Sequence, residues 1–354
     1  MSHKLHEPLP REEVIAAVER KGGHRRVPLV RAKWWGEGWG EGLLDQYADE
    51  LGRFADGYED TVTLWIDDAL LDPACMGLSF FDPAANVGKA IDANVVISDW
   101  NQLDEYLAKL PDPEAPGLFD DLVESAEKAH LDNRYLFFGL WRLFFERPWG
   151  LRGMENLMLD YYDHPEQVHR LLDGLCNVYC GLIRRAARDL KPDAFWTSDD
   201  LGNQRQLMMR PEHFHEFMYP YYCRVGQVCR DCGMHFWLHS CGNNTEALDD
   251  LIDAGVDVFH PVQKHTMDER VIADRFKDRL TFLAGLDVQH TLQEASAEEV
   301  RREVRFLIDT FDRPDGGMAL AAGNAIVAGT PLTNIEAFLD EAVRYGVEHR
   351  SQFA

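Results

Sequence analysis

One repeated pattern limits what this chain can fold into. A short apolar run that ends in polar residues is followed by a longer helical pattern, and this happens eight times. Apolar runs of this length, bounded by glycine and polar residues, are typical of buried parallel strands. Eight strands that alternate with helices predict an α/β fold, a (β/α)8 TIM barrel, as a single domain over residues 1–354. The runs are residues 27–34, 61–68, 135–141, 194–200, 234–241, 256–263, 280–289 and 318–326.

The intervals between the runs carry helix signals. The segment 165–190 places seven apolar side chains on one helical face. Thr330 as a cap, Pro331 in the first turn and Gly346 at the end predict the last helix. The interval 70–133 is too long for one crossover, so we predict an excursion after the second strand that lies near the barrel mouth. The seven apolar positions are Val168, Leu171, Leu172, Leu175, Tyr179, Leu182 and Ile183.

The charge balance excludes two classes of partner. The chain carries 61 acidic and 36 basic residues, a formal net charge of −25. Such a chain repels nucleic acids and anionic membranes, so neither is expected as a main partner. No apolar run reaches the roughly 18 residues that span a bilayer, and residues 1–23 contain no apolar signal-peptide core. We therefore predict a cytoplasmic protein.

The cysteines argue against a disulfide framework. There are seven, an odd number, scattered over a long chain. Cys176 and Cys180 lie four residues apart in a helical pattern and are expected to be buried small hydrophobes. The pair Cys229 and Cys232 has a spacing found in metal and redox sites, but no second pair accompanies it, so we interpret it as mainly structural.

Functional side chains stand where the predicted strands end. The active site of a barrel lies at the carboxyl ends of its strands, and side chains two apart in a strand share a face. His239 with Cys241 forms such a pair, as do Arg31 with Lys33 and Asp287 with Gln289. Polar residues also gather at strand ends simply because loops begin there. The candidates are Arg31, Lys33, Asp67, Asp68, Trp141, Asp199, Asp200, His239, Cys241, His260, Gln263, Asp287, Gln289 and Asn324.

The His239 and Cys241 pair predicts a metal site. Imidazole and thiolate together suit zinc, which needs a third and usually a fourth ligand. The alternative is that both side chains are buried structure. The candidates for the remaining ligands, in falling order of preference, are Asp199, Asp200, His260 and Glu216.

The segment 32–42, AKWWGEGWGEG, holds three tryptophans and four glycines directly after the first predicted strand. It could be a loop whose aromatic side chains pack beneath it. We favour an aromatic wall over a flat ligand, with Trp35 among the contacts, because one short loop cannot bury three indoles. The chain has neither a GxGxxG motif after a strand nor a phosphate-binding Walker loop.

Several segments resemble the uroporphyrinogen decarboxylase superfamily, which includes cobalamin-linked methyltransferases. The resemblance covers nearly the whole chain, and its most specific part is the middle block, TSDDLGNQRQLMMRPEHFHEFMYPYYCRVGQVCRDCGMHFWLHSCGN. It implies a (β/α)8 barrel. The matching segments are residues 11–30, 197–243, 255–263, 283–292 and 316–346.

Within this superfamily, true uroporphyrinogen decarboxylases carry an RQAGRY loop, a catalytic aspartate after the second strand and a late GHGI histidine. Here Arg31 and Lys33 stand in a stretch without the RQAGRY signature. Asp67 matches the catalytic aspartate, and Asn324 replaces the late histidine. These differences make decarboxylation of a haem precursor the less favoured reaction.

The methyltransferase branch holds zinc with an HxC pair and a later cysteine. The resemblance implies that His239 and Cys241 are the pair, but Asn324 stands at the later cysteine. A carboxylate such as Asp200 could replace that ligand and give a harder site. The methyl group would pass to a corrinoid on a separate protein, which docks at the barrel mouth. A basic rim could be provided by Arg31, Lys33, Arg142, Arg147 and Arg152.

The resemblance leads to a methyltransferase or demethylase that works with zinc and a corrinoid protein on a small methylated substrate. The alternatives are a decarboxylase of a tetrapyrrole or other carboxylate, and a non-catalytic ligand-binding barrel. We predict Asp67, Asp200 and Asn324 as catalytic residues, and His239 and Cys241 as metal ligands. The predicted substrate contacts are Arg31, Lys33, Trp35, Trp141, Gln263 and Asp287.

Overall fold

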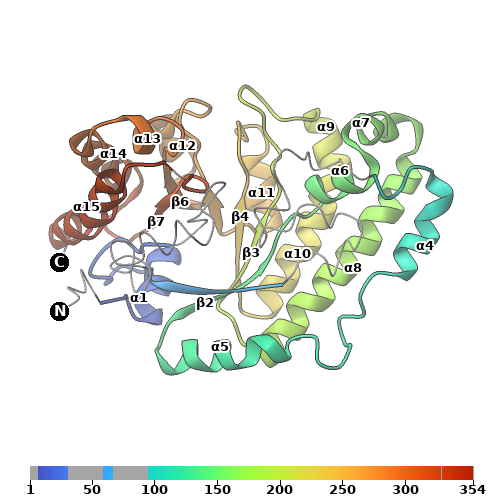
Figure 1. Ribbon diagram of the computed structural model, residues 1–354, viewed down its shortest axis with the longest axis horizontal. Coiled ribbons are helices and arrows are strands. Elements are labelled where there is room, and N and C mark those ends of the chain that lie inside the picture. Colours follow the sequence, from blue (N-terminus) through green and yellow to red (C-terminus); the bar gives the residue numbers. More distant parts are fainter. Residues whose placement is uncertain (1–6, 31–58, 67–94, 328, 354) are drawn as a thin grey trace. The chain divides into compact units, whose positions relative to one another are not determined.

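The computed structural model describes residues 7–30, 59–66, 95–327 and 329–353 (Figure 1). Its strands form one seven-stranded sheet whose order, β1 to β7, follows the chain. Strands β2, β3 and β4 pair in parallel, as do β5, β6 and β7, and helices stand between consecutive strands. The fold is therefore α/β, as the alternating pattern predicted. The strands are β1 (Thr61–Trp65), β2 (Tyr135–Leu140), β3 (Ala194–Ser198), β4 (His235–His239), β5 (Val258–His260), β6 (Thr281–Leu286) and β7 (Met318–Ala322).

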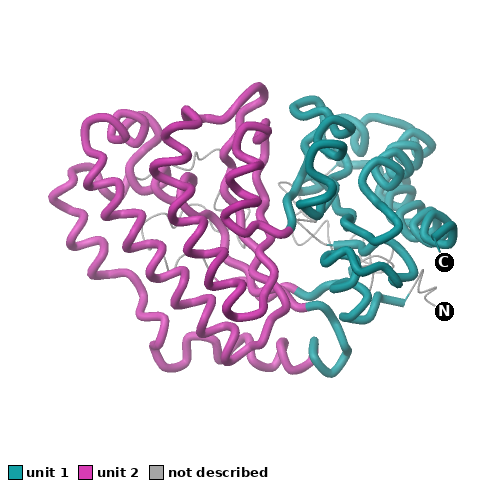
Figure 2. The backbone as a smooth tube through the Cα atoms, turned by 180° about the vertical axis from the view of Figure 1, so that it is seen from behind, with its two compact units in different colours: residues 1–62, 129–135, 258–354 teal, residues 63–128, 136–257 magenta. Residues whose placement is uncertain are grey.

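The chain divides into two compact units, which are described separately (Figure 2). Unit 1 comprises Met1–Val62, Ala129–Tyr135 and Val258–Ala354. Unit 2 comprises Thr63–Lys128 and Leu136–Asp257.

Unit 2 is built on the parallel strands β2, β3 and β4. All six residues of β2 and all five of β3 are buried, which explains their unbroken apolar sequences. Helices α8 and α10 run side by side next to these strands (Figure 1). The helices of this part of the chain are η3 (Trp100–Gln102), α4 (Leu103–Ala108), α5 (Asp120–Leu131), α6 (Glu146–Arg152), α7 (Met154–Asp163), α8 (Pro165–Asp189), α9 (Pro211–His213), the π-helical turn η4 (Phe214–Met218), α10 (Tyr219–Asp231) and α11 (Leu248–Ala254).

The long helix α8 matches its prediction. The helix begins at Pro165, a residue that is favoured in the first turn. All seven apolar side chains predicted on one face are buried. Cys176 and Cys180 lie on the same helix, buried and unbridged, as expected for small hydrophobes. Cys229 is also buried and unbridged.

Unit 1 contains β5, β6 and β7, and its last two helices lie side by side (Figure 1). A capping box between Ser296 and Glu299 begins the first of these two helices. The helices are α1 (Arg11–Val18), α12 (Glu269–Phe276), α13 (Thr291–Glu294), α14 (Ala297–Phe311) and α15 (Leu332–Ser351).

Seven of the eight predicted runs form strands. In the described residues, the first run forms an isolated parallel bridge between Leu29 and Leu320 of β7. Val30 N donates to Leu320 O at 2.9 Å, and Asp60 N donates to Leu29 O at 2.8 Å. The rest of that run lies outside the described residues. The single-domain assignment and the excursion over 70–133 remain predictions, since residues 67–94 also lie outside the described part.

The predicted boundaries of the last helix were wrong. Helix α15 passes through Gly346 and continues to Ser351, and Thr330 bonds to Val327 O instead of capping the helix. Gly346 is buried, and a Cβ at this position would lie 3.5 Å from Val27 N. This is an ordinary van der Waals distance, so Gly346 lies at a buried position within the helix and does not end it. By contrast, Gly255 does end α11, with a left-handed φ of 106°.

Within the described part of the chain, no helix is long and apolar enough to cross a membrane.

Candidate metal centre

The register between β3 and β4 brings two loops together at the carboxyl ends of these strands. Ser198 is paired with His239, and Asp199 N donates to His239 O at 2.9 Å. Asp200 lies two residues after Ser198, and Cys241 lies two residues after His239. Parallel strands in this register therefore place the Asp200 and Cys241 side chains next to each other.

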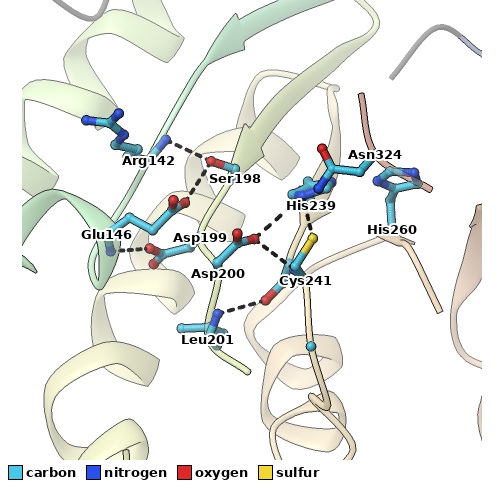
Figure 3. Close-up of polar contacts among 12 residues, drawn as sticks. Arg142, Glu146, Ser198, Asp199, Asp200, Leu201, His239, Cys241, His260 and Asn324 are labelled. Atoms are coloured by element: carbon cyan, nitrogen blue, oxygen red, sulfur yellow. Dashed lines mark hydrogen bonds and ion pairs between the residues drawn. The ribbon is translucent and has the colours of Figure 1, made fainter. Parts of the chain in front are cut away.

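Asp200, His239 and Cys241 form a compact group of ligand atoms (Figure 3). His239 Nε2 lies 3.3 Å from Cys241 Sγ and 3.5 Å from Asp200 Oδ1. The ligand atoms of the three side chains all lie within 4.8 Å of one another, and no other such group occurs in the described residues. Asp200 Oδ1 also accepts a hydrogen bond from Cys241 N at 2.8 Å.

These separations can be compared with those of a zinc site. With Zn–N and Zn–O bonds of about 2.1 Å, a Zn–S bond of about 2.3 Å and tetrahedral angles, nitrogen and sulfur would lie about 3.6 Å apart, and nitrogen and oxygen about 3.4 Å. His239 Nε2 lies 3.5 Å from Asp200 Oδ1, close to the second value, and 3.3 Å from Cys241 Sγ, somewhat shorter than the first. The donor set, and the two separations that involve His239, are compatible with a zinc ion.

The three side chains differ in exposure. His239 is buried, whereas the Asp200 side chain is 36% exposed and Cys241 is partly exposed. Trp141, predicted as a substrate contact, is buried and lies with its ring 5.4 Å from the His239 ring. Trp65 packs edge-on against Trp141 at 5.3 Å, and Gly139 leaves room for it, because a Cβ at this position would lie 2.4 Å from the indole. One side of the group is thus closed by aromatic rings.

Asp199 was preferred over Asp200 as a ligand, and this was wrong. Asp199 is fully buried, and its carboxylate accepts hydrogen bonds from the amides of Phe144, Phe145 and Glu146 and from the Tyr222 hydroxyl. These amides belong to the start of α6, so Asp199 joins this helix to β3. Burial raises the pKa of Asp199 to about 6, although the four donors oppose this shift.

Glu216, the last of the candidate ligands, does not belong to the group of ligand atoms. It is an exposed residue of the turn η4.

Glu146 was missed by the sequence analysis. Its carboxylate is buried and accepts a hydrogen bond from Ser198 Oγ at 2.9 Å (Figure 3). Burial, followed by the negative charges of Asp200 and Asp199, raises the pKa of Glu146 to about 8. The sequence position of Glu146 could have indicated its place near the site. It lies in FFERPWG, shortly after the end of β2, and therefore at the same edge of the sheet as Asp200.

The raised pKa of Glu146 predicts a pH-dependent stability. The folded protein holds the proton up to about pH 8, whereas the unfolded chain loses it near pH 4.5. Because the folded state binds more protons in this window, its free energy of unfolding should fall as the pH rises from about 4.5 to about 8. Glu146→Gln should remove that part of the slope in urea unfolding series with chelator present. An unchanged slope would contradict the assignment, and Glu212→Gln, an exposed glutamate, is the control.

The remaining described candidates lie in unit 1. His260 is buried and directs Nε2 to Ala322 O at 3.0 Å. Asp287 accepts hydrogen bonds from the amides of three following residues, which lower its pKa against the effect of burial. Asn324 Oδ1 accepts from Ala325 N at 2.7 Å, and Gln263 is partly buried. His260 and Asp287 thus have structural contacts, and their predicted roles at a ligand remain untested.

Some predicted residues lie outside the described part of the chain: Arg31, Lys33, Trp35, Asp67 and the whole segment 32–42.

The predicted basic rim was wrong for its three described members, because Arg142, Arg147 and Arg152 are all buried. Arg152 pairs with Asp160 at 2.8 Å and lies over the Trp100 ring, while Arg147 donates to Trp141 O. These guanidinium groups stabilise the loops after β2 from inside.

Comparison with known proteins identifies a family. The model of the uroporphyrinogen decarboxylase (URO-D) family matches residues 149–345. Comparison with the curated proteins finds no significant match. Among solved structures, a methyltransferase from Methanosarcina mazei has a TM-score of 0.63 at 16% identity, covering 96% of this chain and 99% of its own. A B12-independent methionine synthase from Shewanella sp. W3-18-1, in complex with selenomethionine, has a TM-score of 0.52 at 12% identity, covering 92% and 98%. At these identities, the likeness concerns the fold.

Proposed function

Because the chain belongs to the uroporphyrinogen decarboxylase (URO-D) family, we propose that it is a methyltransferase or demethylase of the wider superfamily. It would take a methyl group from a small methylated substrate and pass it to a corrinoid on a separate protein. Its fold resembles that of the Methanosarcina mazei methyltransferase, which is consistent with the proposal. A closed (β/α)8 barrel, a single domain and a cytoplasmic location belong to the same proposal.

The observation that carries this proposal is the group formed by Asp200, His239 and Cys241. These side chains supply one oxygen, one nitrogen and one sulfur, and the two separations that involve His239 are compatible with a zinc ion. We propose that they hold zinc, which would supply Lewis-acid polarisation of the heteroatom that carries the methyl group. Catalytic zinc sites use three protein ligands and leave a position for substrate, whereas structural sites use four.

The surroundings of the group suit an open catalytic site. Asp200 and Cys241 are partly exposed, so a substrate could approach from their side. His239 is buried beside Trp141, which excludes water from the opposite side and limits the movement of the imidazole. Together these residues would bind and orient the substrate heteroatom.

The other predicted site residues keep their predicted roles in this proposal. Asp67 and Asn324 would act in catalysis with Asp200. The substrate contacts would be Arg31, Lys33, Trp35, Trp141, Gln263 and Asp287.

The proposal is tested by direct methyl transfer. The purified protein is mixed with a Co(I) corrinoid protein and a panel of methyl ethers, methyl thioethers and methylamines, and methyl-Co(III) is followed by its absorption spectrum. We expect one class of donor to produce methyl-Co(III), and the His239→Ala, Cys241→Ser double variant to produce none. A parallel arm offers a thiol as the acceptor.

Two outcomes would overturn the proposal. If no donor methylates either acceptor while a carboxylated substrate releases carbon dioxide, the protein is a decarboxylase. If neither reaction occurs but a substrate analogue binds, the non-catalytic ligand-binding barrel takes the place of both enzymes.

A further inference from the structure

We propose that Ser240 and Asn244 are positioning residues that hold Asp200 and Cys241 at ligand distance and thereby set the affinity of the centre for its metal. The inference rests on the proposed function for the metal itself. It adds two residues that are fully buried and contribute no ligand atom to the group.

Ser240 links the two loops that carry the ligands. Its hydroxyl accepts a hydrogen bond from Leu201 N at 3.0 Å and donates one to Asn244 Oδ1 at 2.9 Å. Leu201 directly follows Asp200, and Ser240 lies between His239 and Cys241 in the sequence. A single hydroxyl thus fastens the loop after β3 to the loop after β4, next to each ligand.

Asn244 fixes the turn that contains Cys241. Its Nδ2 lies 3.0 to 3.1 Å from the carbonyl oxygens of Ser240, Cys241 and Gly242, so its two hydrogens serve three acceptors. Gly242 has a φ of 83°, which favours glycine in this turn. The side chain of Asn244 therefore sets the path of the backbone on both sides of Cys241.

The two loops also touch through their backbones. A Cβ on Gly242 would lie 2.2 Å from Gly202 O, and Asn243 N donates to Asn203 O at 2.8 Å. The Asp200 to Cys241 spacing is therefore held by contacts that exist without a metal. Residues that orient ligands in this way typically change metal affinity by about 10- to 100-fold when they are removed.

The test measures metal affinity in Ser240→Ala, Asn244→Ala and the double variant. Each protein is stripped, loaded with zinc or Co(II), and titrated against a chromophoric chelator. We expect each single variant to bind about 10- to 100-fold more weakly. The double variant should lose little more than the worse single variant, since both side chains belong to one network. The Co(II) absorption bands should also shift, which a loss of stability alone would not cause.

Asp193→Asn is the matched control. Asp193 is buried in the same unit and accepts a hydrogen bond from Leu136 N at 2.9 Å, where β2 and β3 begin. This variant should lower thermal stability and leave the metal affinity and the Co(II) spectrum as in the wild type.

A second measurement needs no metal. In metal-free protein, hydrogen exchange at the amide of Leu201 should accelerate in Ser240→Ala and stay unchanged in Asp193→Asn. If the wild type binds metal but Ser240→Ala matches its affinity and spectrum, the positioning role is overturned and the proposed function stands. If the wild type binds no metal, the proposed function fails, and unchanged exchange at Leu201 would overturn the positioning role as well.

Discussion

Replacing Cys241 with serine should remove both the metal and the methyl transfer. A serine hydroxyl is a much poorer zinc ligand than a thiolate. Without Cys241, only Asp200 and His239 of the group in the described residues remain as ligands. Loss of a Lewis acid that contributes several kcal/mol to the transition state should lower the transfer rate by roughly a thousand-fold or more. Elemental analysis and the methyl-corrinoid assay measure the two effects on the same sample.

The control for this variant is Cys232→Ser. Cys232 is another partly exposed, unbridged cysteine of unit 2, and it lies at the end of α10, outside the group of ligand atoms. It should keep wild-type metal content and rate. If Cys241→Ser retains full activity without metal, the metal centre has no part in the reaction.

Replacing Asp199 with alanine should cost about 3–5 kcal/mol in the free energy of unfolding, because buried donors lose their acceptor. Its carboxylate serves the first amides of α6 and the Tyr222 hydroxyl. The neighbouring change Asp200→Ala removes a partly exposed side chain that accepts from Cys241 N and should cost about 1 kcal/mol or less.

Urea unfolding with chelator present compares these two variants without a metal contribution. Metal titration should give the opposite order, with the larger loss of affinity in Asp200→Ala. Equal destabilisation by both changes would show that the two neighbouring aspartates do not have the separate roles assigned to them.

The sequence predicted how the main ligands meet. Apolar runs that alternate with helical patterns give consecutive parallel strands, and the ends of neighbouring strands lie at one edge of the sheet. His239 and Cys241 at the end of one run, and Asp200 at the end of the run before it, could therefore be expected to be close. The Ser198–His239 register is consistent with that expectation.

The sequence could not decide between Asp199 and Asp200. Successive side chains at a strand end point in opposite directions, and only the position of α6 shows which carboxylate meets its amides. Glu146 was missed for a related reason. It begins a helix, where glutamate is common, and its hydrogen-bond partner, Ser198, belongs to another strand that is distant in the sequence.

The basic rim and the end of the last helix failed because neither burial nor packing is visible in local sequence. Arg152 has the sequence character of a surface residue, yet it pairs with Asp160 inside the unit. Gly346 carries a typical helix-stop signal, but it is a buried position within α15, which continues past it to Ser351. Tertiary contacts overrode the local pattern in both cases.

X-ray absorption at the zinc edge, on protein purified without chelator, tests the metal centre most directly. We expect about one zinc per chain, with one sulfur at about 2.3 Å and nitrogen or oxygen neighbours at about 2.0–2.2 Å. The sulfur neighbour should disappear in Cys241→Ser and remain in Cys232→Ser. Protein that contains no zinc, or zinc without a sulfur neighbour, would contradict a centre built from Asp200, His239 and Cys241.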